Sequence, residues 1–175
     1  MSEKNDNDSH YHELSGHEGL AKIAELVKGI RIAMMTTVAK DGTMSSRPMA
    51  VQDTPFNGTL WFLTRRGSEK VEELAKDQHV TLTLAEPKDS KYISLKGVAN
   101  VSQDRGKIKA LWNPLYKAWF PGGEDDPEIA VVRVEVSEGD YWEASGSRLV
   151  MLVKYAAAAV TGGKVPVGEA GHVAV

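Results

Sequence analysis

Hydrophobic and polar residues alternate along several segments of this chain, which is the pattern of β-strands with one buried face. The clearest case is residues 79–85, in which Val80, Leu82 and Leu84 are separated by threonines. An Asn-Gly pair at residues 57–58 indicates a tight turn between two such segments. The strands predicted from this pattern span residues 32–39, 43–51, 59–64, 79–85, 92–102 and 129–136.

Three other segments carry apolar residues at the three- and four-residue spacing of helices. In the first, Ser15 and Glu18 have the spacing of a capping box, and Gly29 is expected to end the helix. Two shorter helices are predicted over residues 69–76 and 104–112. Helices of this length flank a sheet; they do not form layers on both of its faces.

Six or so strands with only short helices between them predict a mainly β (α+β) domain. We expect an antiparallel barrel rather than a doubly wound parallel sheet. Gly97 interrupts one predicted strand, where a bulge or a close approach of another backbone is expected. We expect residues 1–14 to be a disordered arm, residues 15–148 to be the domain, and residues 149–175 to be a tail that packs only partly.

Composition narrows the class of protein. The 175 residues suffice for one domain with a core, and 42% hydrophobic and 26% charged residues are typical of a soluble globular protein. The net charge of -3 argues against nucleic-acid binding. Cysteine is absent, and no secretory or membrane-spanning segment is recognisable, so we expect a cytoplasmic protein without membrane contact. We interpret His10, His12 and His17 as part of a solvated arm rather than a metal site.

One predicted strand carries an arginine and a proline, Arg47 and Pro48, where an ordinary strand would alternate apolar and polar residues. The next strand ends near Thr64, and Ser68 and Lys70 follow at the start of a predicted helix. Helix starts attract phosphate groups, and arginine suits them as a bidentate ligand. The alternative is a solvated cationic face. Because an arginine in an otherwise apolar strand needs a partner, the pattern favours a bound phosphate.

Four short motifs follow one another in the chain: S-R-P-M-A-V at residues 46–51, L-W-F-L-T at 60–64, S-E-K at 68–70 and Y-W-E at 141–143. In this order and spacing they resemble the pyridoxamine 5'-phosphate oxidase-like split β-barrel flavoproteins, and more narrowly their bacterial general stress protein branch. The resemblance covers roughly residues 15–148 and includes the segment W-F-P-G-G-E-D-D-P at residues 119–127.

The resemblance implies an antiparallel split β-barrel with short flanking helices, FMN as the cofactor, and a homodimer with a flavin at each end of the subunit interface. It assigns residues to the flavin ring, to the ribityl chain and phosphate, and to an aromatic wall from the second subunit. Core or dimer packing is the alternative role for each tryptophan. The implied residues are Ser46, Arg47, Pro48 and Met49 at the ring, Phe62, Leu63 and Thr64 beside the ribityl chain, Ser68 and Lys70 at the phosphate, and Trp112, Trp119 and Trp142 on the wall.

Three hypotheses for the function stay open. The first is a flavin-dependent oxidoreductase acting on a small substrate at the dimer cleft. The second is a flavin-binding stress protein that sequesters FMN without turnover, and the third is a β-barrel interaction protein that binds another anion. Residues 141–148 contain one arginine and no histidine, so oxidation of pyridoxamine phosphate itself is not expected. No catalytic residue is identified, and FMN is preferred to a deazaflavin or haem because the predicted site suits a terminal monophosphate.

Overall fold

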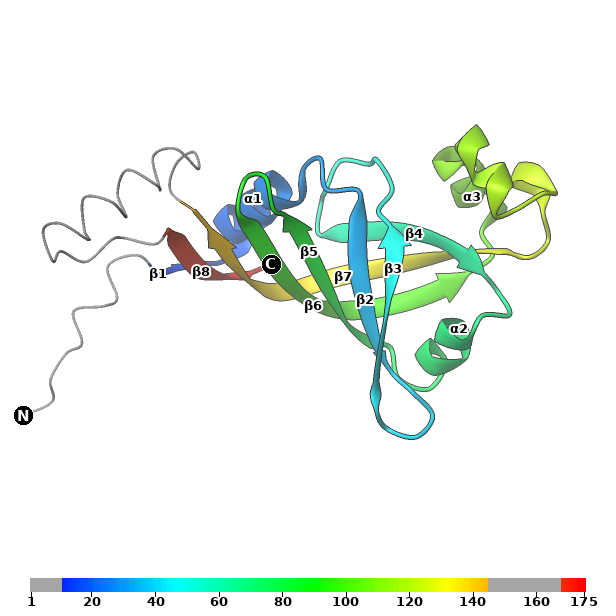
Figure 1. Ribbon diagram of the computed structural model, residues 1–175, viewed down its shortest axis with the longest axis horizontal. Coiled ribbons are helices and arrows are strands. Elements are labelled where there is room, and N and C mark those ends of the chain that lie inside the picture. Colours follow the sequence, from blue (N-terminus) through cyan, green and yellow to red (C-terminus); the bar gives the residue numbers. More distant parts are fainter. Residues whose placement is uncertain (1–10, 145–167) are drawn as a thin grey trace, which may run out of the picture.

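The computed structural model describes residues 11–144 and 168–175, and its centre is one sheet of eight strands (Figure 1). Three α-helices and two short 3-10 helices flank the sheet. The strands are β1 (Tyr11–Leu14), β2 (Ile32–Val38), β3 (Met44–Ala50), β4 (Thr59–Arg65), β5 (His79–Glu86), β6 (Lys91–Ser102), β7 (Ile129–Glu143) and β8 (Glu169–Ala174), and the helices are α1 (Gly16–Val27), α2 (Glu69–Leu74), α3 (Arg105–Leu111), η1 (Pro114–Ala118) and η2 (Gly123–Asp125).

The strands lie in the order β1-β8-β7-β6-β5-β2-β3, and β4 pairs with β7 outside this path. Every pair is antiparallel except β1 with β8. The register of β6 on β7 shifts between Lys96 and Gly97. A Cβ on Gly97 would lie 2.3 Å from the carbonyl oxygen of Glu135, so the bulge and the close backbone approach predicted at this glycine are both confirmed. The predicted mainly β (α+β) split barrel is confirmed, with one parallel pair added.

The main core lies between the inward-facing side chains of the strands and helix α1. The alternation predicted for β5 is confirmed, because Val80, Leu82 and Leu84 are all buried. A second, smaller cluster forms where α3 and the 3-10 helices cover the ends of β4 and β7; its buried members are Ile108, Leu111, Phe120, Ile129 and Val131. Burying side chains of this size stabilises the fold by about 1.5–3 kcal/mol each.

The two ends of the domain differ from the sequence-based prediction. The disordered arm was expected through residue 14, but Tyr11–Leu14 forms β1, which pairs with β8 in the expected tail. Strand β8 in turn pairs with Glu138–Glu143 of β7, which runs past the predicted end at residue 136. These short strands depend on hydrogen bonds to partners distant in sequence, so local alternation gives little sign of them. Residues 1–10 of the arm and 145–167 of the tail lie outside the described residues.

Helix α1 confirms one of the two predicted end signals. Gly29 adopts φ +82°, just beyond the C-cap residue Lys28, as expected for a helix stop. Ser15 occupies the N-cap position, but its side chain makes no capping hydrogen bond. The capping box is therefore wrong in detail: Gly16, the first helical residue, has φ +57°, which is far from helical geometry.

Candidate functional site

A cavity of about 460 Å³ lies between β3, the end of β4, the start of α2 and the 3-10 helix η1. Two short strands and a helix start therefore meet at one place, as the sequence predicted. The lining residues are Ile32, Pro48, Met49, Ala50, Gln52, Leu63, Thr64, Arg65, Ser68, Lys70, Tyr116, Trp119 and Phe120. Pro48, Met49, Leu63, Thr64, Ser68, Lys70 and Trp119 are thus the predicted site residues that the structure brings together.

The other predicted residues lie elsewhere. Phe62 is fully buried in the main core, so within this chain it has no access to the cavity. Trp112 packs in the second core cluster, with its ring 5.9 Å from that of Tyr116. Trp142 lies opposite Tyr92 on the outer face of the sheet, away from the cavity. Ser46 is exposed and shares a 2.6 Å hydrogen bond with Thr36.

Trp119 lines the cavity of its own chain, as do Lys70 and Leu63. The wall from a second subunit that the family resemblance implies for Trp119 stays a prediction. Trp119 stands just after η1 and is 61% exposed, so its ring is free to cover a ligand. It reaches the cavity because the loop from α3 to β7 folds back over the end of β4.

The polar end of the cavity is built around Lys70. Its Nζ donates to the Thr64 hydroxyl at 3.1 Å, and that hydroxyl lies 3.4 Å from Ser68 Oγ. In the part of the chain that the structure describes, no carboxylate forms an ion pair with Lys70 within 4.0 Å. Burial, and then the positive charge of Arg47, lower the pKa of Lys70. A bound anion would offset both effects, so this end of the cavity fits a phosphate group.

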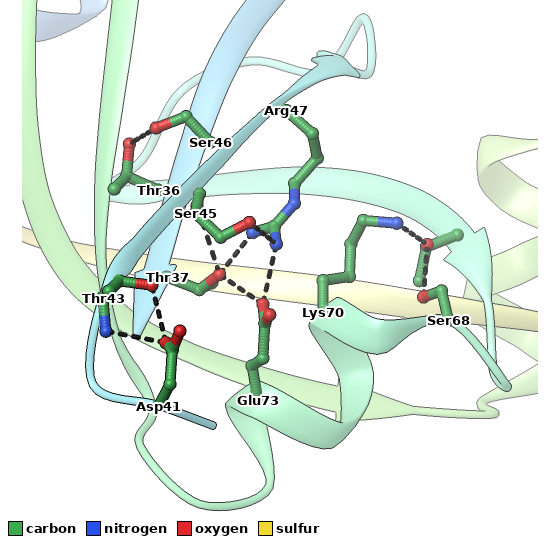
Figure 2. Close-up of polar contacts among 11 residues, drawn as sticks. Thr36, Thr37, Asp41, Thr43, Ser45, Ser46, Arg47, Ser68, Lys70 and Glu73 are labelled. Atoms are coloured by element: carbon green, nitrogen blue, oxygen red, sulfur yellow. Dashed lines mark hydrogen bonds and ion pairs between the residues drawn. The ribbon is translucent and has the colours of Figure 1, made fainter. Parts of the chain in front are cut away.

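Arg47 already has an acidic partner inside the chain. Its Nη2 donates to Glu73 Oε2 at 2.7 Å and to Ser45 Oγ at 2.9 Å, and Nη1 donates to the Thr37 hydroxyl (Figure 2). Thr37 donates to the same Glu73 oxygen at 2.6 Å. The sequence argument that Arg47 needs a bound phosphate as its partner is therefore wrong, because Glu73 on α2 is that partner.

Helix α2 supplies less to the site through its dipole than the sequence suggested. It has only six residues, and a macrodipole grows with the number of aligned peptide units. Ser68 is its N-cap, as predicted, but its hydroxyl makes no capping hydrogen bond and lies instead near Thr64. Side chains, not the helix terminus, thus provide the charge and most of the hydrogen-bonding groups here.

The other end of the cavity is aromatic, and the side chains of Arg65 and Gln52 tie it to the barrel. Arg65 Nη2 donates to the carbonyl oxygen of Trp119 at 2.5 Å, and its guanidinium lies 5.8 Å from the centre of the Phe120 ring. Tyr116 donates its hydroxyl hydrogen to Gln52 Oε1 at 3.1 Å. Gln52 is 5% exposed, so this bond satisfies a buried amide.

The sequence analysis did not identify Gln52, Tyr116 or Glu73. A local signal existed only for Gln52, a polar residue directly after the apolar end of a predicted strand. Tyr116 and Glu73 reach the site through contacts that span 64 and 26 residues, and no local pattern shows those. Among the described residues, no helix is long and apolar enough to cross a membrane, and no three His, Asp or Glu side chains gather as metal ligands.

The chain belongs to the family described as "Pyridoxamine 5'-phosphate oxidase like", whose model matches residues 18–166. The chain is also similar to Protein bli-3 of Neurospora crassa, with 32% identity over 121 residues. That match covers 63% of this chain and 58% of Protein bli-3, so the chain spans less than two thirds of that relative.

Solved structures agree with the family assignment. The general stress FMN/FAD binding protein of Xanthomonas citri is 25% identical, with a TM-score of 0.64 over 75% of this chain and 93% of that one. General Stress Protein 26 of Bacillus anthracis is also 25% identical, with a TM-score of 0.61 over 69% and 91% of the two chains. A structure from Jannaschia sp. CCS1 is 24% identical and covers 89% of this chain at a TM-score of 0.75, which supports the fold.

Proposed function

We propose that the chain binds FMN in the cavity between β3, β4, α2 and η1. The observation that carries the proposal is Lys70, a half-buried cation that pairs with no carboxylate among residues 11–144 and 168–175, at one end of a cavity whose other end is aromatic. Lys70, Ser68 and Thr64 would hold the phosphate, and Pro48, Met49 and Trp119 would line the ring. The Xanthomonas citri relative, described as FMN/FAD binding, supports this assignment.

FMN is the flavin that best matches the charges of the site. A terminal monophosphate carries close to two negative charges at neutral pH, whereas each phosphate within a diphosphate carries one. Lys70 donates to one hydroxyl and keeps further N–H donors for such a group. The resulting preference for FMN over FAD is testable by titration with both flavins.

We further propose a homodimer that uses the outer face of the sheet. Ile32 and Met34 on β2 are 52% and 39% exposed, and the paired residues Tyr92 and Trp142 are 48% and 52% exposed. Large apolar side chains that share one sheet face are typical of a surface that is covered by a partner. Ile32 also lines the cavity, so a second copy seated on this face would contact the bound flavin.

Bound flavin would supply the redox chemistry, namely hydride or electron transfer to or from a small substrate. The chain would contribute binding, orientation and exclusion of water. The described lining residues that could move a proton are Lys70 and Tyr116, and no catalytic role is assigned to either. The second candidate function is a flavin-binding stress protein without a dedicated turnover.

Absorbance spectroscopy tests the binding proposal first. The purified protein is expected to be yellow, or to become so after incubation with FMN and removal of free flavin. A colourless protein that does not retain added FMN would overturn it. Steady-state reduction of the bound flavin by NADH or NADPH would then support an oxidoreductase, and no reduction by either would support the non-catalytic candidate.

A cytoplasmic location is proposed from the cysteine-free composition and is tested by cell fractionation.

A further inference from the structure

Glu73 is a buried acid three residues along α2 from the proposed phosphate ligand Lys70. Its side chain is 6% exposed, and its Oε2 accepts hydrogen bonds from Thr37 at 2.6 Å and from Arg47 at 2.7 Å. Figure 2 shows Glu73 directed at Arg47, while Lys70 is directed away from this pair, at the Thr64 hydroxyl next to Ser68. A carboxylate in such surroundings is ionised only because these groups stabilise it, and the Thr37 hydrogen bond and the Arg47 charge both lower the pKa of Glu73.

The charges of this cluster affect one another. The pKa of Lys70 is lowered by burial and by the positive charge of Arg47, while the negative charges of Glu73 and Glu69 act in the opposite direction. The Arg47–Glu73 pair is close to neutral as a unit. Of the described cations at the polar end of the cavity, Lys70 is therefore the one that has no carboxylate within ion-pair distance.

We propose that Glu73 is a specificity-determining residue: its carboxylate offsets the charge of Arg47 and so limits how strongly the cavity attracts a phosphate group. Arg47 is held by Thr37 and Ser45 of the β2–β3 hairpin and by Glu73 of α2, while Lys70 would contact the phosphate. This inference rests on the proposed function and deepens it. On this inference, Glu73 sets how much more tightly the cavity binds a phosphorylated flavin than an unphosphorylated one.

Glu73→Gln separates charge from shape. The glutamine oxygen, in the place of Glu73 Oε2, can still accept from both Arg47 and Thr37, so the hydrogen-bonded arrangement is retained while the negative charge is lost. Titration with FMN and with riboflavin, which lacks the phosphate, gives the ratio of the two affinities. We expect this ratio to rise roughly three- to tenfold, because one partly screened charge is removed near a dianion. An unchanged or lower ratio would overturn the proposal.

Glu72→Gln is the matched control. Glu72 is the preceding residue of α2, but its side chain is 54% exposed and pairs with Lys40 at 2.5 Å. Solvent screens this charge, so we expect the ratio to stay within about twofold of the wild-type value. A rise equal to that of Glu73→Gln would show that any lost negative charge on α2 suffices, which would contradict a specific role for Glu73.

A pair of Arg47 variants covers the case in which Glu73→Gln alone folds poorly. Arg47→Gln leaves Glu73 uncompensated, and we expect the ratio to fall at least about tenfold. Arg47→Gln combined with Glu73→Gln removes both charges, so the ratio should return to within about threefold of the wild type. A double variant whose affinity ratio stays as low as that of Arg47→Gln would overturn the proposal, because Arg47 would then bind the phosphate directly. Wild-type protein that does not bind FMN would instead overturn the proposed function.

Discussion

The two ends of the cavity are built in different ways. The polar end consists of Thr64 on β4 and of Ser68 and Lys70 at the start of α2, and buried hydrogen bonds such as Thr37–Glu73 anchor α2 to the barrel. The aromatic end consists of η1 and the residues after it; contacts from Arg65 and Gln52 hold it, and Phe120 packs in the second core cluster. The cation thus lies on α2 beside the end of β4, while the aromatic side chains of the cavity come from η1 and the residues after it.

This division implies separate contributions to ligand binding. Under the proposed function, the polar end would recognise the phosphate and discriminate between flavins. The aromatic end would add affinity for any flavin ring, with or without a phosphate. Changes at the two ends should therefore differ in their effect on FMN and riboflavin, and the following variants test that difference.

The largest expected effect is that of Lys70→Ala at the polar end. Losing a charge-assisted contact to the phosphate should weaken FMN binding by about 1–3 kcal/mol, measured by isothermal titration. Lys76→Ala, on the exposed residue after α2, is the control and should bind FMN as the wild type does. An unchanged dissociation constant for Lys70→Ala would contradict the assignment of the phosphate to this end of the cavity.

Trp119→Ala tests the aromatic end. We expect FMN and riboflavin to lose affinity equally, by about 0.5–1.5 kcal/mol, because stacking area is lost without any change in charge. The melting temperature should hardly change, since the side chain is 61% exposed. Leu115→Ala is the matched control on η1, with an exposed side chain that does not line the cavity. If Trp119→Ala changed FMN and riboflavin binding by different factors, the two ends would not be separable.

Tyr116→Phe tests the anchor of the aromatic end. It leaves the buried Gln52 oxygen without this donor, which should lower the free energy of unfolding by about 0.5–1.5 kcal/mol in urea titrations. Tyr92→Phe removes a hydroxyl from an exposed tyrosine on β6 and should leave stability unchanged. Equal losses in the two variants would argue against the Tyr116–Gln52 bond as an anchor.

The smallest effect concerns the stability of the flavin-free protein. Because burial lowers the pKa of Lys70, its charged form is less favourable in the folded chain than in the unfolded chain. Lys70→Met should therefore be more stable than the wild type near pH 7, by less than about 1 kcal/mol given solvent screening. The unfolded chain binds the extra proton, so wild-type stability rises as the pH increases through the folded pKa of Lys70. The difference in the free energy of unfolding between the two proteins should therefore shrink as the pH rises to about 11. A difference that does not change with pH would contradict this account.

Most of the barrel could be predicted because its signals are local. The alternation of Val80, Leu82 and Leu84 and the interruption at Gly97 each identify a feature of the fold. Strands β1 and β8 escaped prediction because they are stabilised by pairing with each other and with β7. The length of β7 was underestimated for the same reason.

The site was predicted in part, because motifs identify residue types and not their partners. Lys70, Ser68 and Thr64 meet as expected, since they lie within seven residues of one another. Arg47 was correctly expected to need a partner, but Glu73 lies 26 residues away and comes close only when α2 packs against the hairpin. Phe62 faces the core, which its position in an apolar strand could not distinguish from a place beside the cavity.

Paired titrations with FMN and riboflavin test the central claim most directly. The claim is that Lys70 at the polar end of the cavity recognises the phosphate of FMN. We expect wild-type protein to bind FMN at least about tenfold more tightly than riboflavin, and Lys70→Ala to bind the two with nearly equal affinity. Equal affinities in the wild type, or an undiminished preference for FMN in Lys70→Ala, would contradict the account.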